Sequence, residues 1–245
     1  MGQTGNVSLS LATVLEKSLN MTSHNLANAS TAGYKTVNPV FKSTAGGQAN
    51  GAETVHFVQS TGTYLDTTQG SVFRTDNPLD IAVSGDGWLA FETDGGAPAY
   101  GRFGQLVLNA DGQMVTAAGR PILDVNGGPI TLPAEVGTNV TIAADGSVTD
   151  EQNNILGQIG VFQVPKAETL APIGRGLYAA EDGEALAPAE EARVLQGYLE
   201  ASNVEPVLEM TRLIDIQRAY EGSIKLMTEE DELTKQVIQR LGRRS

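Results

Sequence analysis

The chain has 245 residues, no cysteine and a formal net charge of −13 at pH 7, with 28 glycines and one tryptophan. The absence of cysteine excludes disulfides and thiolate metal sites, and the length suffices for one large domain or two small ones. No apolar run approaches the roughly 18 residues of a membrane span, so we expect no direct membrane insertion.

The negative charge is concentrated in the middle of the chain. Residues 43–198 carry 19 acidic and 6 basic side chains, whereas residues 1–42 have a net charge of +2 and residues 199–245 a net charge of −2. Such a middle would repel the phosphates of a nucleic acid, so we expect no nucleic-acid partner. The acidic middle is typical of a surface exposed to solvent, whereas the near-neutral ends could pack against each other or against other molecules.

An amphipathic helix is expected near the N-terminus. Its apolar stripe consists of residues alternately four and three apart, with three leucines at its flank: Val7, Leu11, Val14, Ser18 and Met21, with Leu15, Leu19 and Leu26. Asn25 and Asn28 continue this stripe with amides, and Gly33 can supply the positive φ that ends a helix.

A β-rich middle is expected after a Gly/Ser/Thr-rich connector with short strand patterns. From residue 79, alternating apolar residues predict strands, and Asp-Gly pairs predict turns at 86–87, 94–95, 111–112, 145–146 and 182–183. The segments 109–123 and 143–156 loosely repeat an Ala-Asp-Gly turn, a short strand, a polar turn and Ile-Leu. These features favour an antiparallel sandwich or small barrel of successive hairpins.

A second, longer helix is expected near the C-terminus, starting close to Pro206, because proline is tolerated in a first helical turn. Its stripe is Met210, Leu213, Gln217, Tyr220, Ile224, Met227, Asp231, Thr234, Ile238 and Leu241, widened by Ile214, Leu226, Leu233 and Val237. Isolated helices are marginal in water. Each terminal helix must therefore pair with the other, with the β domain or with other molecules, in an α+β chain whose paired helices flank a mainly antiparallel β domain.

The sequence gives little support for catalysis, metal binding or a cofactor. His24 and His56 are far apart and have no carboxylate at ligand spacing, and the Asp-Gly turns lack the spacing of a calcium loop. Paired carboxylates for glycoside hydrolysis are not excluded by spacing, although one tryptophan is poor support for a sugar-binding cleft. We expect no enzyme and no cofactor. A cell-wall-acting or carbohydrate-binding protein and a β-domain adhesin with coiled-coil stalks stay as alternatives.

Three segments resemble those of the flagellar axial proteins, the rod and hook family. "HNLANASTAGYK" (24–35) matches the family motif Asn-Leu-Ala-Asn-x-x-Thr-x-Gly-Phe/Tyr-Lys, and "PLDIAVSGDGWLAF" (78–91) is similar to the opening of the family's β domain. "VLQGYLEASNVEPVLEMTRLIDIQRAYE" (194–221) is similar to its C-terminal signature. The chain departs from the family pattern at Asn6, usually a bulky aromatic, and at His24, usually asparagine.

This resemblance implies a structural subunit of the bacterial flagellar basal-body rod, in the periplasmic space. Length and residues 7–20 are most similar to a proximal rod subunit, and a distal rod subunit is the alternative. The implied partners are other copies of the chain and other rod proteins, with proximal subunits below and the distal subunit above. The family also implies export through the flagellar type III secretion channel without a cleaved signal peptide.

The expected domains are an N-terminal helix and motif (1–42), the connector (43–78), an outer β domain (79–198) and a C-terminal helix (199–245). The helices would form a coiled-coil-like rod core that packs against neighbours. We expect the amides of Asn25 and Asn28 to bond to adjoining subunits where the chain bends at Gly33. The whole expected interface is Leu11, Val14, Leu15, Met21, Asn25, Leu26, Asn28, Gly33, Asn203, Met210, Leu213, Ile214, Gln217, Tyr220, Ile224 and Met227.

Overall fold

The computed structural model describes residues 2–45, 56–164, 170–174, 176–180, 186–189 and 191–242. Long helices and many short antiparallel strands make this an α+β chain, as expected. The chain divides into two units: unit 1 is Met1–Ala27, Val37–Tyr64 and Glu205–Ser245, and unit 2 is Asn28–Thr36 and Leu65–Val204. Neither of the helices described is both long and apolar enough to cross a membrane. The four-part domain scheme stays a prediction.

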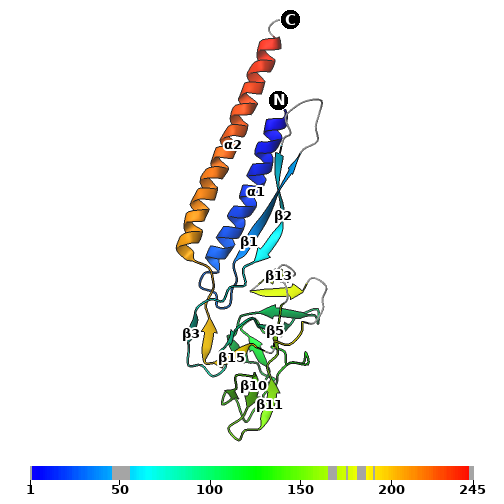
Figure 1. Ribbon diagram of the computed structural model, residues 1–245, viewed down its shortest axis with the longest axis vertical. Helices are drawn as coiled ribbons and strands as arrows, with labels where there is room; N and C mark the ends of the chain where they lie inside the picture. The colour runs from blue at the N-terminus through cyan, green and yellow to red at the C-terminus, as the bar shows by residue number, and fades with distance from the viewer. Residues whose placement is uncertain are drawn as a thin grey trace. The chain divides into compact units, whose positions relative to one another are not determined.

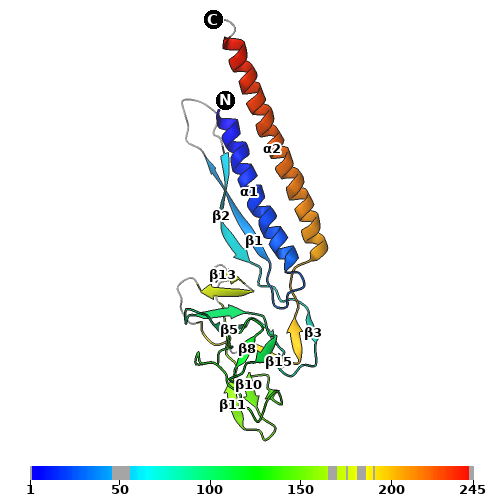
Figure 2. The same cartoon turned by 180° about the vertical axis from the view of Figure 1, so that it is seen from behind.

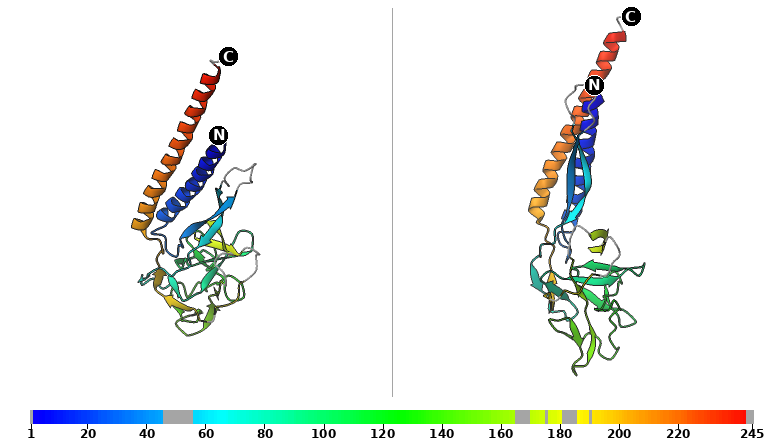
Figure 3. Two further views of the ribbon diagram at one scale, coloured as in Figure 1. Left: turned by 45° about the horizontal axis from the view of Figure 1, so that its top comes forward. Right: turned by 45° about the vertical axis from the view of Figure 1, so that its right-hand side comes forward.

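Unit 1 consists of the two helices and a two-stranded sheet (Figure 1). Helices α1 (Gly2–Ala27) and α2 (Pro206–Gly242) lie side by side and antiparallel (Figures 1 and 2), and Ser223 Oγ of α2 donates a hydrogen bond of 3.0 Å to Ser8 O of α1. Strands β1 (Val37–Ala45) and β2 (His56–Leu65) lie along the other side of α1, so that α1 is covered on two sides (Figure 3).

The buried stripe of α2 differs from the expected one. The side chains of α2 that are buried or half-buried are again alternately four and three residues apart: Glu209, Leu213, Ile216, Tyr220, Ser223, Met227 and Glu230. The expected stripe shares only three members with this set, and its other described members are exposed: Met210, Gln217, Ile224, Asp231, Thr234 and Leu241. Ile238 is also expected in the stripe, but its side chain lies outside the part of the chain that the structure describes. A coiled-coil core built on the expected stripe is therefore not confirmed.

The helix ends agree in part with expectation. Helix α2 begins at Pro206, as expected. Helix α1 ends at Ala27, and Gly33, which has φ of +67°, lies in the turns that follow rather than at the helix end. The glycine is required there because a Cβ atom would lie 2.3 Å from the backbone C and O of Arg102.

Unit 2 is built from β-strands. One sheet has five antiparallel strands in the order β12-β5-β6-β14-β13, which are Val161–Phe162, Trp88–Glu92, Pro98–Gly101, Leu177–Ala180 and Leu170–Gly174. A second sheet has the order β11-β10-β9, which are Ile155–Gln158, Ser147–Thr149 and Thr141–Ile142. Three strand pairs complete the unit: β15 (Arg193–Gln196) with β4 (Ile81–Ser84), β16 (Tyr198–Glu200) with β3 (Val72–Arg74), and β7 (Leu106–Leu108) with β8 (Met114–Thr116).

The Asp-Gly turns are largely confirmed. The pairs at 94–95, 111–112 and 145–146 join β5 to β6, β7 to β8 and β9 to β10. The pair at 86–87 joins β4 to β5, but these strands pair with other strands, so no hairpin forms there. The pair at 182–183 lies outside the described residues.

The core of unit 2 is one apolar cluster drawn from many short strands. Its members come from β4 to β10, β12, β14 and β15 and from the loops between them, and include Ile81, Leu89, Phe91, Met114 and Val148, each at most 1% exposed. Full burial of such a side chain contributes about 1.5–3 kcal/mol. This cluster therefore holds together strands that are too short to be stable as separate hairpins.

Candidate assembly site

Within unit 2, residues 33–36 of the N-terminal motif pair with residues 200–203 of the C-terminal signature. Gly33 N donates a hydrogen bond of 2.8 Å to Glu200 O, and Asn203 N donates one of 3.4 Å to Tyr34 O. The side chain of Asn203 extends this junction because its Oδ1 accepts from Thr36 N and Thr36 Oγ1, both at 2.8 Å. Segments 167 residues apart in sequence are thus tied by backbone and side-chain bonds.

Three buried charges form the centre of this junction, which we call the ion triad: Lys35, Arg102 and Glu200. Lys35 Nζ lies 2.6 Å from Glu200 Oε1, and Arg102 Nη1 lies 3.2 Å from Glu200 Oε2. The three side chains are at most 2% exposed. Burying ions is costly unless they are paired and hydrogen-bonded, so each carboxylate oxygen has its own cation.

Backbone groups complete the coordination of the triad. Lys35 Nζ also donates to Thr68 O at 2.6 Å, and Gly70 N donates to Glu200 Oε1 at 3.0 Å. Arg102 donates to the carbonyls of Val83 and Gly85 at 3.2 and 2.6 Å. Only Arg102 Nε is buried without a hydrogen-bond partner among the described atoms of the triad.

Burial changes the protonation properties of the triad. It lowers the pKa of the Lys35 ammonium from its ordinary value, while the hydrogen bond to Glu200 acts in the opposite direction. It likewise lowers the pKa of the Arg102 guanidinium, which lies over the ring of Trp88 at 5.5 Å from the ring centroid. A cation over an indole ring is attracted by the negative face of the ring, so the only tryptophan of the chain packs directly against the triad.

The amide of Asn25 has its partner inside the chain. Within unit 1, Asn25 Nδ2 donates to Val37 O at 3.0 Å and Asn25 Oδ1 accepts from Val37 N at 3.1 Å, and the residue is 2% exposed. Within unit 2, Asn28 Oδ1 accepts from Thr31 Oγ1 at 3.2 Å. Both amides therefore have partners within their own chain after α1, and the expectation that they bond to adjoining subunits stays a prediction.

Helix α2 presents many apolar side chains to solvent. The set is Val207, Leu208, Met210, Ile214, Ile224, Leu226, Leu233 and Leu241, with exposed fractions from 39% for Ile224 to 74% for Val207. Val207, Met210 and Ile214 follow the spacing of one helix face, and Leu226 and Leu233 are seven residues apart on another. We call this set, whose members lie on more than one side of the helix, the exposed apolar face of α2. Exposed apolar side chains gathered in this way mark interaction surfaces.

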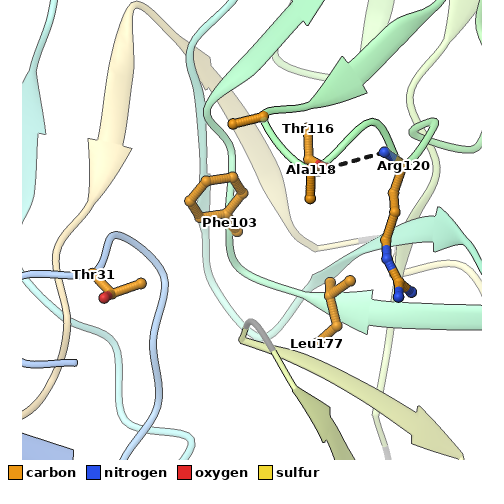
Figure 4. Close-up of a pocket in the computed structure, with 7 residues that line it drawn as sticks. Thr31, Phe103, Thr116, Ala118, Arg120 and Leu177 are labelled. Atoms are coloured by element: carbon orange, nitrogen blue, oxygen red, sulfur yellow. Dashed lines mark hydrogen bonds between the residues drawn. The ribbon is translucent and has the colours of Figure 1, made fainter. Parts of the chain in front are cut away.

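Unit 2 also has an apolar pocket of about 290 Å³ (Figure 4). It is lined by Thr31, Phe103, Thr116, Ala117, Ala118, Arg120 and Leu177. Its rim is the tight turn 116–120, where Arg120 N donates to Thr116 Oγ1 at 3.2 Å. The Nη1 atom of Arg120 is buried and has no hydrogen-bond partner among the described residues.

The expected interface residues fall into three classes of exposure. Val14, Asn25 and Gly33 are buried, and the exposed ones are Leu11, Met210, Ile214, Gln217 and Ile224. The half-buried ones are Leu15, Met21, Leu26, Asn28, Asn203, Leu213, Tyr220 and Met227. Sequence reasoning missed the triad, although Lys35 and Glu200 lie in the quoted motifs. The available signal was Lys35 at the end of the otherwise uncharged motif 24–35 and Glu200 as the single charge of the stretch 194–204.

Comparisons with known proteins match this chain to flagellar rod and hook proteins. A model described as "Flagellar hook protein FlgE/F/G D1 domain" matches residues 82–150, and one described as "Flagellar basal body rod FlgEFG protein C-terminal" matches residues 195–240. The flagellar basal-body rod protein FlgF of Caulobacter vibrioides is 37% identical over 240 residues, 97% of each chain. FlgF of Salmonella typhimurium is 35% identical over 86% of this chain and 87% of its own. The rod protein FlgG of Bacillus subtilis is 31% identical over 90% and 92%.

Proposed function

We propose that this chain, which belongs to the family of flagellar basal-body rod proteins, is a structural subunit of the proximal rod that joins its neighbours through its terminal helices. Relatives named FlgF are 32–37% identical to it over nearly the whole chain. A relative named FlgG is 31% identical over a smaller share. The comparisons therefore do not favour the alternative of a distal, FlgG-type subunit.

The observation that carries this proposal is the exposed apolar face of α2. Ile214 and Leu226 are 49% and 60% exposed although α1 already lies along this part of the helix. Burying the rest of such a side chain contributes about 1 kcal/mol or more. Neighbouring subunits that cover this face in a helical tube would gain that free energy at every copy, and rigid helix packing would carry torque along the rod.

The partners follow from the same proposal. Other copies of the chain and other rod proteins, proximal subunits on one side and the distal subunit on the other, would cover the helices in the basal body. The subunit would reach this place through the flagellar export channel without losing an N-terminal signal. The relatives are structural rod proteins, and we propose no catalytic role.

A charge placed on the exposed apolar face tests the helix interface. Ile214→Glu, at a side chain that is 49% exposed, should leave the helix content of the isolated protein unchanged but should fail to restore motility and rods in cells whose own gene is deleted. The matched control is Gln236→Glu, which adds the same charge at an exposed polar position of α2 and should restore both. Full complementation by Ile214→Glu would refute the helix interface, and normal rods in the deletion strain would refute the rod function itself.

Copy number and position test the proximal assignment. Labelled protein in purified basal bodies should be present in few copies and should lie below the distal rod. Mass spectrometry of the same material should recover the N-terminal residues, since no signal would have been removed. Labelling along the whole distal rod would reassign the chain to that segment.

A further inference from the structure

We propose that the apolar pocket of unit 2 receives Ile155 from the β10–β11 hairpin of a second copy of the chain, with Arg120 facing the acidic turn of that hairpin. This inference rests on the proposed rod function and adds a contact between β domains that the helices do not supply. The pocket and the hairpin are both parts of unit 2.

The pocket has the size and chemistry for one apolar side chain. Its volume of about 290 Å³ lies just below the roughly 300–1,000 Å³ of small-molecule sites. The side chains around it are mainly apolar, and Phe103, Ala118 and Leu177 lie on different sides of the same space (Figure 4). The buried Nη1 of Arg120 lacks a partner among the described residues, and Nη2 is 3.8 Å from Asp94, whose side chain is 99% exposed. An occupant with an apolar side chain would fill the pocket, and a hydrogen-bond acceptor beside that side chain would pair with the buried Nη1 of Arg120.

The β10–β11 hairpin carries the matching groups. Ile155 is 76% exposed, the largest exposed fraction among the large apolar side chains described in unit 2. Glu151, exposed in the turn that precedes Ile155, supplies a carboxylate. Charge complementarity points to this partner, because unit 2 is strongly acidic and two such surfaces repel unless a cation lies at their contact.

The hairpin is rigid enough to act as a knob. Asp150 Oδ1 accepts from Gln152 N and Asn154 N, both at 2.8 Å, and Asn154 Nδ2 donates to Asp150 Oδ2 at 2.8 Å. A turn that is already ordered loses little conformational entropy when it docks. The contact is still small, so it would form mainly where the helices already hold the copies close together.

The positions of knob and pocket predict an open chain of contacts. Within unit 2, the β10–β11 hairpin and strand β13, the neighbour of Leu177 in β14, lie at opposite ends (Figures 1 and 3). A knob at one end and a socket at the other give a head-to-tail contact, which continues from copy to copy instead of closing into a dimer. Such a contact suits a rod.

Cysteine crosslinking tests the contact, because the natural chain has no cysteine. The variant Ala118→Cys plus Ile155→Cys is expressed in cells whose own gene is deleted, and purified basal bodies are oxidised with copper phenanthroline and oxygen. A disulfide needs Cα atoms about 4.4–6.8 Å apart, so the proposal predicts loss of the monomer band and a ladder of multimers that a reductant removes. The matched control, Ala118→Cys plus Val107→Cys, keeps its monomer band, because Val107 is an exposed apolar residue elsewhere in unit 2.

Two outcomes would overturn the inference while the rod function stands: motile cells whose rods give no ladder, or crosslinks from the cysteine of Ala118→Cys to a different rod protein. A charge exchange gives an independent readout. Arg120→Glu and Glu151→Arg should each reduce swimming, and the double variant should restore it. Absence of restoration in stably folded protein also counts against the contact. Normal swimming without the gene would instead refute the rod function.

Discussion

Replacing Glu200 with glutamine should destabilise unit 2 more than any other single charge removal there. The carboxylate lies 2.6 Å from Lys35 and 3.2 Å from Arg102, distances at which the attraction is about 6 and 5 kcal/mol for an effective dielectric constant near 20. Desolvation of the three ions offsets most of this gain. Removing the one anion leaves two buried cations unpaired, and we expect the free energy of unfolding to fall by about 3–5 kcal/mol.

Urea unfolding followed by the fluorescence of Trp88 measures this change, because the indole is 2% exposed and lies against Arg102. The control Glu135→Gln removes an exposed carboxylate of the same unit and should change the free energy by less than about 0.5 kcal/mol. The triple variant Lys35→Met, Arg102→Met and Glu200→Leu should recover part of the loss, since no ion stays buried alone. If Glu200→Gln unfolds at the same urea concentration as the control, the triad does not stabilise the junction.

Three further predictions concern the backbone and the turns. Asn25→Ala should lower the free energy of unfolding of unit 1 by about 2–3 kcal/mol, measured by circular dichroism, because Val37 N and O lose their buried partners; an unchanged midpoint would contradict this. Gly33→Ala should cost about 3 kcal/mol or more and Gly119→Ala only about 1 kcal/mol, since both have positive φ but only Gly33 meets backbone atoms at 2.3 Å; equal losses would show that the close approach is unimportant. Hydrogen bonds from Asn154 and Gln152 lower the pKa of Asp150, so its stabilising effect is present above pH 3.8 and is lost as the pH falls through the lowered pKa. Asp150→Asn should therefore flatten the acid unfolding curve, and an identical curve would contradict the assignment.

The terminal helices show which features a periodic apolar pattern predicts and which it does not. The positions of both helices and the start of α2 at Pro206 follow from apolar spacing and proline chemistry. The buried side of α2 does not follow, because Ser223 and Glu209 lie there while Met210 and Ile214 are exposed. A small serine that donates to Ser8 O lets the helices approach closely, and an apolar pattern cannot distinguish a face kept for this partner from a face kept for another molecule.

The junction shows where sequence reasoning ends. The Asp-Gly turns and antiparallel strands of unit 2 follow from local chemistry, since φ and strand pairing are set within a few residues. The bond of Asn25 to Val37 joins residues 12 apart, and Arg102 reaches Glu200 across 98 residues. No spacing rule covers such distances, so the partner of neither side chain can be predicted before the fold is known.

The unequal lengths of α1 and α2 have a practical consequence for anyone who wishes to watch this subunit in living cells. From the contact between Ser8 and Ser223, α1 continues for six residues, roughly 9 Å, whereas α2 continues for nineteen, roughly 28 Å. The last turns of α2 have no α1 beside them (Figure 1). A fluorescent tag placed beyond that helix would crowd its bare tip, whereas an insertion at the exposed 94–96 turn of unit 2 would add nothing to either helix and would keep the label visible.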